Sequence, residues 1–511
     1  MALASTLTAT VEGVSAHMVT VETNVGPGLP GMHMVGLGDA AVKESRERIR
    51  TAIANTALPW PRTKIMVSLS PAHLPKAGSH FDLPIALSVV ASLDPAVHAR
   101  LGRTVIMGEL ALDGSLRRVE GVLPMLLAAE RARGQAPEFD FDTVIVPRAN
   151  AEEAALLGQR RVLLGDTLPQ VYQWLRGEVG LERAIDVPRE SAAAPAAPDF
   201  ADVAGQLFER KALEVAAAGG HHVMMVGPPG SGKSMLAERL PSILPPLTVA
   251  EQIETTALHS AAGVSRGEIV AERPFVAPHP SLTRVELIGG GSGTPRPGAV
   301  SQAHNGVLFL DEASEISAHV LDSLRIPLEK RQVVHRRNRR EVTYPADFQL
   351  ILAANPCRCG KSGAECTCRS GSRHLANVSG PLRDRLDIFL TTTAQSAVLS
   401  PVGVETSAEI VDRVAGARER AAARWSKAGL NAAVNARVDS AFLRRHFPPV
   451  EAAAQTLQWM LKSQALTQRG VDRVLKLAWT VADLSGEDTP HMEHIDEALT
   501  LRGATGAGVA A

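Results

Sequence analysis

A glycine-rich run near the middle of the chain has the composition and spacing of a phosphate-binding loop. It fits the pattern G-x-x-x-x-G-K-[ST] and consists of Gly227, Pro228, Pro229, Gly230, Ser231, Gly232, Lys233 and Ser234. Glycines let successive backbone N–H groups curl around phosphate oxygens, the lysine reaches the terminal phosphates, and the serine hydroxyl can ligate Mg²⁺. An apolar segment, 222–226, precedes the run and a helical pattern follows it. The sequence therefore predicts a site for ATP and Mg²⁺.

Two more apolar segments end in polar side chains that nucleotide hydrolysis would use. Residues 307–310 lead into Asp311 and Glu312, and residues 348–354 lead into Asn355. Asp311 can hold Mg²⁺ through its water shell, and Glu312 can orient or deprotonate an attacking water. Asn355 could hold that water near the γ-phosphate, or it could only begin a turn. The three segments together predict ATP hydrolysis.

The cysteines form a second candidate site. All four of them lie between positions 357 and 368, as the pairs Cys357, Cys359 and Cys366, Cys368. Two C-x-C pairs joined by a glycine-containing connector can place four thiolates around one Zn²⁺. So tight a cluster in a long chain is not a disulfide framework. We expect one structural zinc ion, with free thiols or a redox pair as the alternatives.

The densest positive run of the chain lies between positions 330 and 340. The chain has 53 Lys and Arg against 54 Asp and Glu, so its net charge of -1 gives no overall attraction for a polyanion. A nucleic-acid site must then be a local patch. The run suits contacts to DNA phosphates, unless it is only a solvated basic surface. Its basic residues are Lys330, Arg331, Arg336, Arg337, Arg339 and Arg340.

The elements that must position these residues follow from the apolar patterns. Strand-like segments alternate with helical ones up to about residue 400, which predicts an α/β fold with a mostly parallel sheet in the second half. Helical periodicity dominates after that. The expected strands are 19–25, 64–69, 104–108, 143–147, 222–226, 306–310 and 348–353.

A length of 511 residues corresponds to about three domains. We expect an N-terminal α/β domain over 1–175, a linker over 176–199, an ATPase core over 200–398, a helical lid over 399–505 and a frayed tail over 506–511. The most apolar stretch, 83–93, is too short for a spanning helix. No leader pattern opens the chain, so we expect a cytoplasmic protein without a membrane partner.

Longer motifs surround the candidate nucleotide site. Residues 274–279 read P-F-x-A-P-H, 287–292 read L-I-G-G-G-S, 297–312 read P-G-x-x-S-x-A-H-N-G-V-L-F-L-D-E, 354–360 read A-N-P-C-x-C-G, and 379–385 read S-G-P-L-x-D-R. Together they resemble the magnesium-chelatase-like AAA+ ATPases of the YifB/ComM type, over nearly the whole chain. The resemblance implies a hexameric ring with a P-loop core and a helical lid. It also implies a motor that moves on DNA, with branch migration during recombination or transformation as its task, and it places the basic run on a hairpin at the central pore.

The same resemblance assigns roles to several arginines. In the L-x-D-R segment, Arg385 would be the finger that completes the neighbouring subunit's site, with Arg383 as the alternative and a surface ion pair to Asp384 or Asp387 as the simpler interpretation. In the lid, Arg469 would contact the γ-phosphate of its own chain as the second sensor. Arg473 is also a candidate, since residues four apart share one helix face.

The N-terminal motifs V-G-L-G-D at 35–39, A-G-S-H-F-D-L-P-I-A at 77–86 and G-E-L-A-L-D-G-S-L at 108–116 resemble the Lon-protease-type domain. Lon-type proteolysis uses a Ser and Lys pair. In a gapless register the serine falls on His80 and the lysine on Leu123, so we expect a non-catalytic scaffold. The competing functions are a magnesium-chelatase motor subunit that drives metal insertion, and a nucleotide-gated scaffold that does not translocate.

Overall fold

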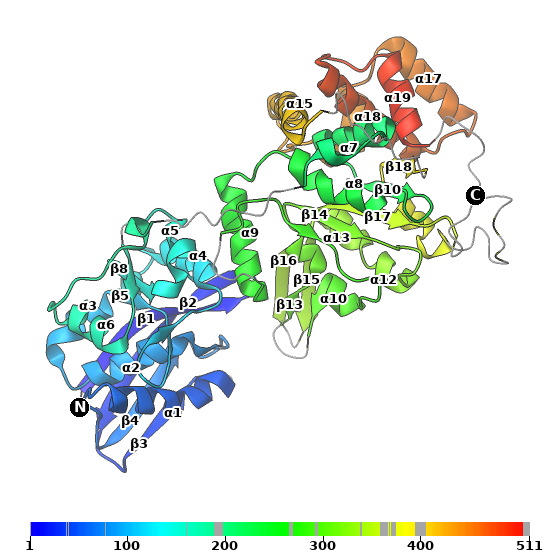
Figure 1. Cartoon of the computed structure of the whole chain (residues 1–511). Helices are drawn as coiled ribbons and strands as arrows, with labels where there is room; N and C mark the ends of the chain where they lie inside the picture. Colours follow the sequence, from blue (N-terminus) through cyan, green and yellow to red (C-terminus); the bar gives the residue numbers. More distant parts are fainter. Residues whose placement is uncertain are drawn as a thin grey trace.

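The chain folds into two α/β parts with helix α9 (Val249–Ala262) between them, as the computed structural model shows (Figure 1). The described residues are 2–36, 38, 40–76, 78–159, 161–188, 198–264, 269–291, 295–337, 340–357, 366, 368, 375–393 and 405–503. Residues 189–197 of the expected linker (176–199) and the whole of the expected tail (506–511) lie outside them.

The N-terminal part is built on one mixed sheet. Its seven described strands stand in the order β3-β4-β2-β1-β5-β8-β9, where β2 is antiparallel to both β1 and β4 and the last four strands run parallel. They are β1 (Ala2–Glu12), β2 (Ser15–Gly26), β3 (Gly31–Val35), β4 (Lys64–Ser70), β5 (Thr104–Ile106), β8 (Thr143–Pro147) and β9 (Val162–Gly165). The helices are α1 (Ala40–Asn55), α2 (Asp82–Ala91), α3 (His98–Gly102), α4 (Val122–Ala132), α5 (Ala151–Ala155) and α6 (Leu168–Leu175), and a short ribbon is formed by β6 (Glu109–Leu110) and β7 (Leu116–Arg117).

The four strands expected in this part are all present, but the apolar pattern did not predict β1. The reason is that β1 buries threonines. Thr6, Thr8 and Thr10 are almost completely buried, and the hydroxyls of Thr6 and Thr10 donate to backbone carbonyls at 3.0 and 3.1 Å. A hydrogen-bonded threonine fits a core that a search for apolar side chains overlooks.

The second part is built on a parallel sheet of five described strands, in the order β11-β14-β17-β10-β18. They are β10 (Val223–Val226), β11 (Phe275–Val276), β14 (Val307–Leu310), β17 (Gln349–Ala354) and β18 (Ile388–Thr391). The helices around it are α7 (Leu207–Gly219), α8 (Lys233–Arg239), α9 (Val249–Ala262), α10 (Arg284–Ile288), α11 (Ala299–Gln302), α12 (Ala318–Asp322), α13 (Arg325–Lys330) and α14 (Gly380–Arg383). Every residue of β17 is buried, as expected for a central parallel strand.

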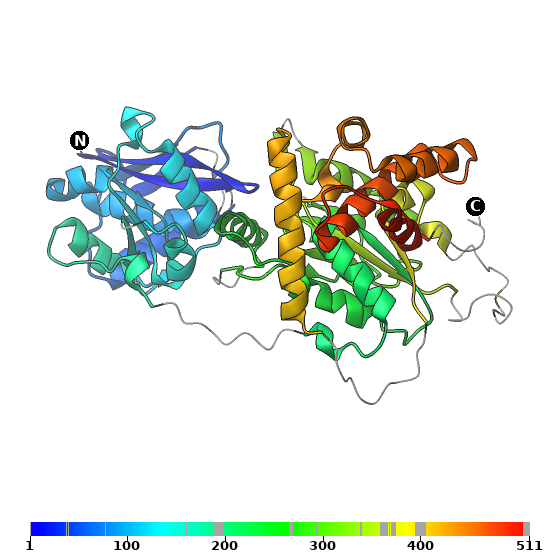
Figure 2. The same cartoon turned by 90° about the horizontal axis from the view of Figure 1, so that it is seen from above.

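Helices cover both faces of this sheet. Val307 and Phe309 of β14 belong to an apolar core shared with α7 and the C-terminal helices, whereas Leu308 and Leu310 belong to a core shared with α10, α11 and α12. Figure 2, where α15 is the long yellow-orange helix, shows the C-terminal helices gathered over one side of this part. They are α15 (Ser407–Lys427), α16 (Ser440–His446), α17 (Glu451–Lys462), α18 (Gln468–Ser485) and α19 (Met492–Leu501).

Two small ribbons extend from the second part toward the N-terminal part (Figure 1). One pairs β12 (Gly289–Gly290) with β13 (Arg296–Pro297), and the other pairs β15 (Gln332–Arg337) with β16 (Arg340–Pro345). The second ribbon contains most of the basic run and is called the basic hairpin below.

None of the helices in the described ranges combines the length and the apolar character needed to cross a lipid bilayer.

Candidate functional site

The glycine-rich run forms the turn between β10, which ends at Val226, and α8, which begins at Lys233. Gly230 and Gly232 have φ angles of +74° and +81°, which side chains other than glycine rarely adopt. Ser231 shares a 2.7 Å hydrogen bond between hydroxyls with Thr392, and its carbonyl accepts from the Gln206 amide at 2.8 Å. The loop is therefore held in shape from both flanks.

The Lys233 ammonium points into the curl of this loop. Its Nζ donates to Gly227 O at 2.7 Å, to Pro228 O at 2.9 Å and to Asn355 Oδ1 at 3.2 Å. Only 7% of the residue is exposed, and burial lowers the pKa of the ammonium. All three acceptors are uncharged, so they do not neutralise the positive charge of the ammonium. A phosphate bound in the loop would supply the missing negative charge. The loop fits the triphosphate of a nucleotide on this ground.

A hydroxyl and a carboxylate meet beside the loop. Ser234 Oγ donates to Asp311 Oδ2 at 2.9 Å, while Asp311 Oδ1 accepts from the backbone N–H of Glu312 at 2.8 Å. Oxygen ligands of this kind are those that Mg²⁺ takes in nucleotide sites. Glu312 is exposed, and its backbone has a φ of +47° in the turn that follows β14.

Lys233, Ser234, Asp311 and Asn355 thus come together as the sequence predicts, because the carboxyl ends of β10, β14 and β17 meet at one edge of a parallel sheet. Sequence reasoning missed Thr392. The signal was present, since the apolar strand β18 also runs into polar residues at this edge.

The three predicted arginines lie away from the phosphate loop of their own chain. Arg385 forms an ion pair with Glu329, Arg469 pairs with Asp384 at 3.0 Å, and Arg473 pairs with Asp387 at 2.8 Å. The partner of Arg385 is therefore neither of the two aspartates considered above.

Strand direction explains this separation. Asp387 comes directly before β18, and its N–H donates to His222 O, directly before β10. The phosphate loop and Thr392 lie at the other ends of the same two strands. Each strand has four residues, so at about 3.3 Å per residue the two ends are about 13 Å apart. Arg385 and Arg473 both line a cavity of about 550 Å³ on the side of His222.

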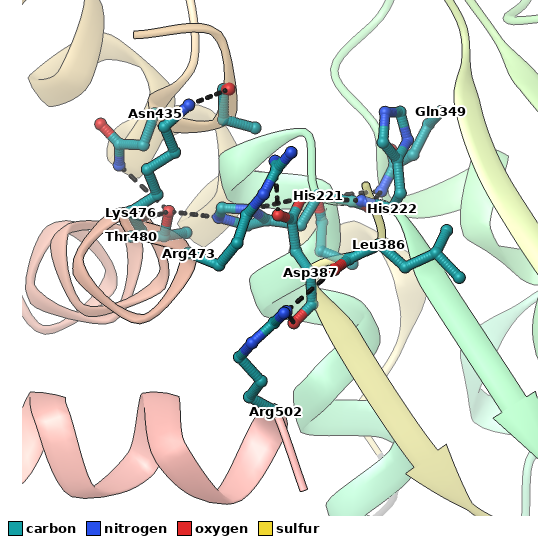
Figure 3. A network of polar contacts seen from close by, with 12 residues as sticks. His221, His222, Gln349, Leu386, Asp387, Asn435, Arg473, Lys476, Thr480 and Arg502 are labelled. Carbon is teal, nitrogen blue, oxygen red and sulfur yellow. Dashed lines mark hydrogen bonds and ion pairs between the residues drawn. The ribbon is translucent and has the colours of Figure 1, made fainter. Parts of the chain in front are cut away.

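A buried polar network fixes the C-terminal helix α18 to the sheet where β10 and β18 begin (Figure 3). His221 contacts Asp387 through Nδ1 at 3.2 Å and Thr480 of α18 through Nε2 at 2.8 Å. Arg502 donates to Leu386 O at 2.9 Å. Burial by itself raises the pKa of Asp387, but Arg473 and His221 more than reverse this, so the pKa of this carboxyl lies well below its ordinary value. Asp387 is therefore ionised and ties α18 to the sheet.

We expect Asp387→Asn to lower the free energy of unfolding by about 3–5 kcal/mol, because it leaves the partly buried Arg473 guanidinium without its carboxylate. A lowered pKa gives stability that is present above the ordinary Asp value, about 3.9, and is lost as the pH falls below it. Thermal unfolding at pH 7 and at pH 3 checks both points: the variant should melt lower at pH 7, and the difference should shrink at pH 3. The control is Asp384→Asn, whose exposed pair with Arg469 should contribute at most about 1 kcal/mol. Equal melting temperatures for Asp387→Asn and wild type at pH 7 would contradict the assignment.

Three of the four cysteines converge just after Asn355. One Sγ atom each from Cys357, Cys366 and Cys368 lies within 4.8 Å of the others, and those of Cys357 and Cys366 are 3.2 Å apart. Cys359 lies outside the described residues. Three thiols so placed can bind a metal ion that prefers sulfur ligands.

The basic hairpin combines buried apolar side chains with an exposed arginine. Val333, Val342 and Tyr344 are buried, whereas the Arg336 side chain is 79% exposed and pairs with Glu341 at 2.7 Å. Lys330 ends α13, and Arg331 follows it at a φ of +54°. The side chains of Arg337 and Arg340, and all of Arg339, lie outside the described residues.

The two N-terminal positions expected to correspond to the Ser and Lys of a Lon-type protease hold a histidine and a leucine instead. His80 is buried with Nε2 against Ala9 O at 2.8 Å, and Leu123 is buried in α4. The neighbouring Ser79 donates to the Glu109 carboxylate, while the buried Lys76 ammonium donates to Pro71 O. A serine that faces a carboxylate has no amine to activate it.

Comparison with known proteins covers almost the whole chain. The family profile described as "Magnesium chelatase, subunit ChlI" matches residues 199–398, "Subunit ChlI of Mg-chelatase" matches 21–150, and "Magnesium chelatase, subunit ChlI C-terminal" matches 404–502. An uncharacterized protein of Mycobacterium tuberculosis is 45% identical, over 99% of this chain and 100% of the relative. The uncharacterized protein YifB of Escherichia coli is 37% identical over 98% and 97%. The competence protein ComM of Haemophilus influenzae is 37% identical over 98% of both chains.

Proposed function

Since the chain belongs to the magnesium-chelatase-like family of the YifB/ComM type, we propose that it is a Mg²⁺-dependent AAA+ ATPase that assembles into a hexameric ring and moves on DNA. One observation carries the ATPase assignment: the Lys233 ammonium and the Ser234–Asp311 pair lie at the same sheet edge as Asn355, in contacts of 3.2 Å or less.

The residues at this edge divide the chemistry among them. Lys233 would exchange its carbonyl acceptors for oxygens of the terminal phosphates, and Ser234 and Asp311 would hold the magnesium ion. When bound, Mg²⁺ neutralises charge on the β- and γ-phosphates. Glu312 accepts a proton from the attacking water, and Asn355 helps to orient that water.

The arginine finger would come from a neighbouring subunit. Arg385 lies at the opposite edge of the sheet from its own phosphate loop, so the ATP that it reaches must belong to another chain of the ring. Arg469 and Arg473 remain candidates for the second sensor. To reach the γ-phosphate of their own chain they must leave Asp384 and Asp387, which requires the lid to rotate.

DNA is the proposed substrate because the basic hairpin concentrates positive charge in a chain of net charge -1. Replacing Arg336, Arg337, Arg339 and Arg340 with alanine should preserve basal ATPase activity and abolish DNA binding at physiological salt. The dependence of log affinity on log salt should become shallower by up to about 3, because each lost phosphate contact to a single strand removes about 0.7 from the slope. Fluorescence anisotropy with a single-stranded oligonucleotide at several salt concentrations measures this.

The matched control removes four exposed arginines elsewhere: Arg46, Arg50, Arg62 and Arg131. It changes the net charge equally and should leave the slope unchanged. Unchanged affinity in the hairpin variant would contradict DNA binding at this hairpin. Branch migration is tested by ATP-dependent unwinding of a synthetic four-way junction, which Lys233→Ala should abolish.

We also propose that Cys357, Cys359, Cys366 and Cys368 hold one structural Zn²⁺. Metal analysis of the purified protein should find about one zinc ion per chain, and Cys357→Ser should lose it together with part of the thermal stability. Well under one zinc ion per correctly folded wild-type chain would contradict the site. The N-terminal part, in this proposal, is a Lon-like domain that serves as a scaffold without peptidase activity.

A further inference from the structure

The N-terminal part contacts the basic hairpin through the tight turn between β1 and β2. Gly13 occupies this turn at a φ of +69°, between paired Glu12 and Ser15. A Cβ atom added at Gly13 would lie 2.6 Å from Val342 Cγ1 on β16 and 3.8 Å from the Tyr344 ring. The two chain segments, more than 300 positions apart in sequence, are therefore in van der Waals contact. Figure 1 shows the end of the β1–β2 hairpin beside β16.

Val14 continues this contact as an apolar cluster. It packs with Val342 and Tyr344 of the hairpin and with Leu258 of α9. The Tyr344 hydroxyl donates to Pro295 O at 2.5 Å, which links the hairpin to the loop before β13. On the hairpin, Val333 faces the core of the second part, whereas Val342 and Tyr344 face this cluster.

The N-terminal part is itself anchored to the same helix α9. The N–H of Gly121, at the start of α4, donates to Ser260 Oγ of α9 at 2.8 Å. Ser260 Oγ in turn donates to the buried Glu153 carboxylate at 3.4 Å. Since α9 contacts both parts, the turn at Gly13 is presented to β16 in a defined position.

We propose that the Gly13–Val14 turn is the positioning element of the basic hairpin, so that the N-terminal part sets where the hairpin meets its ligand. A two-stranded ribbon is at best marginally stable in water by itself, and in the described part of the chain β15 and β16 pair only with each other. The packing of Val14 against Val342 and Tyr344 supplies the stabilisation that the isolated ribbon lacks. The consequence for DNA rests on the proposed function; the consequence for hairpin order does not.

The test uses Gly13→Asn. Asparagine tolerates a left-handed backbone, so the variant adds a side chain where Val342 lies without much backbone strain. The matched control is Gly134→Asn, at a φ of +72° with no atom within 4 Å of an added Cβ. Hydrogen exchange of the amides of β15 and β16 should accelerate about 10-fold or more in Gly13→Asn and stay unchanged in the control.

Two further readouts separate the possible outcomes. DNA affinity should fall in Gly13→Asn while basal ATPase activity stays at the wild-type level. Adding Val342→Ala removes the clashing methyl group and should restore part of both hairpin protection and DNA affinity. Unchanged exchange in the hairpin, or general loss of protection throughout the chain without rescue, would overturn the proposal. If the arginine variants of the hairpin still bind DNA while Gly13→Asn loosens the hairpin, then the proposed function fails and this inference stands.

Discussion

Replacing Arg385 with alanine is expected to lower the rate of ATP hydrolysis by about 10³-fold or more, the range measured for arginine fingers in other nucleotide hydrolases. The variant should still bind ATP, because Arg385 lies at the opposite sheet edge from its own phosphate loop. Steady-state hydrolysis and equilibrium binding of a labelled nucleotide measure the two quantities. The control is Arg383→Ala, two residues earlier, where the guanidinium lies 6.0 Å from the Phe389 ring and no comparable loss is expected.

Mixing two inactive variants tests whether the finger acts between subunits. Lys233→Ala chains keep Arg385 but cannot use ATP, and Arg385→Ala chains keep an intact phosphate loop. In mixed rings some interfaces combine the intact loop of one chain with the intact arginine of the next, so part of the activity should return. Activity that stays at the level of the separate variants at every mixing ratio would contradict a finger in trans. Unchanged hydrolysis by Arg385→Ala alone would remove its catalytic role.

Glu312→Gln should lower kcat by about 10²–10⁴-fold, because the amide cannot accept the proton of the attacking water. ATP affinity should be retained, since the side chain is exposed and the Mg²⁺ and phosphate contacts come from Ser234, Asp311 and Lys233. Bound ATP should therefore persist and stabilise the ring, which size-exclusion chromatography with ATP would detect.

Glu315→Gln is the control for this variant, with the same change three residues along the chain and no expected effect on kcat. If Glu312→Gln lost ATP binding, the Glu312 carboxylate would be needed to bind the nucleotide and not to activate water. Near-normal biological activity despite lost turnover would favour the nucleotide-gated scaffold over a motor.

Sequence patterns anticipated the parts of the fold that depend on near neighbours. The β10 strand, the turn at Gly230 and Gly232, and the helix at Lys233 are encoded within a dozen residues, because glycines, an apolar run and a lysine at set spacing suffice. The expected strands around 143–147 and 348–353 were found for the same reason, since most of their residues are apolar. By contrast, β1 escaped because its inward threonines look polar until their hydrogen bonds to distant carbonyls are known.

The types and spacing of the residues were enough to predict the proposed nucleotide chemistry of this protein. Charge and hydrogen bonding limit the residue types that can hold phosphates and magnesium, and a parallel sheet brings the ends of its strands together whatever the details of packing. Only the tertiary structure decided which edge each arginine occupies and which segments touch. Arg385, Arg469 and Arg473 were recognisable as cations, but their distance from the phosphate loop depends on the direction of β18 and on the docking of α18 at Asp387. The contact of Gly13 with Val342 depends on how the two parts of the chain meet at α9, and no local pattern in either segment records it.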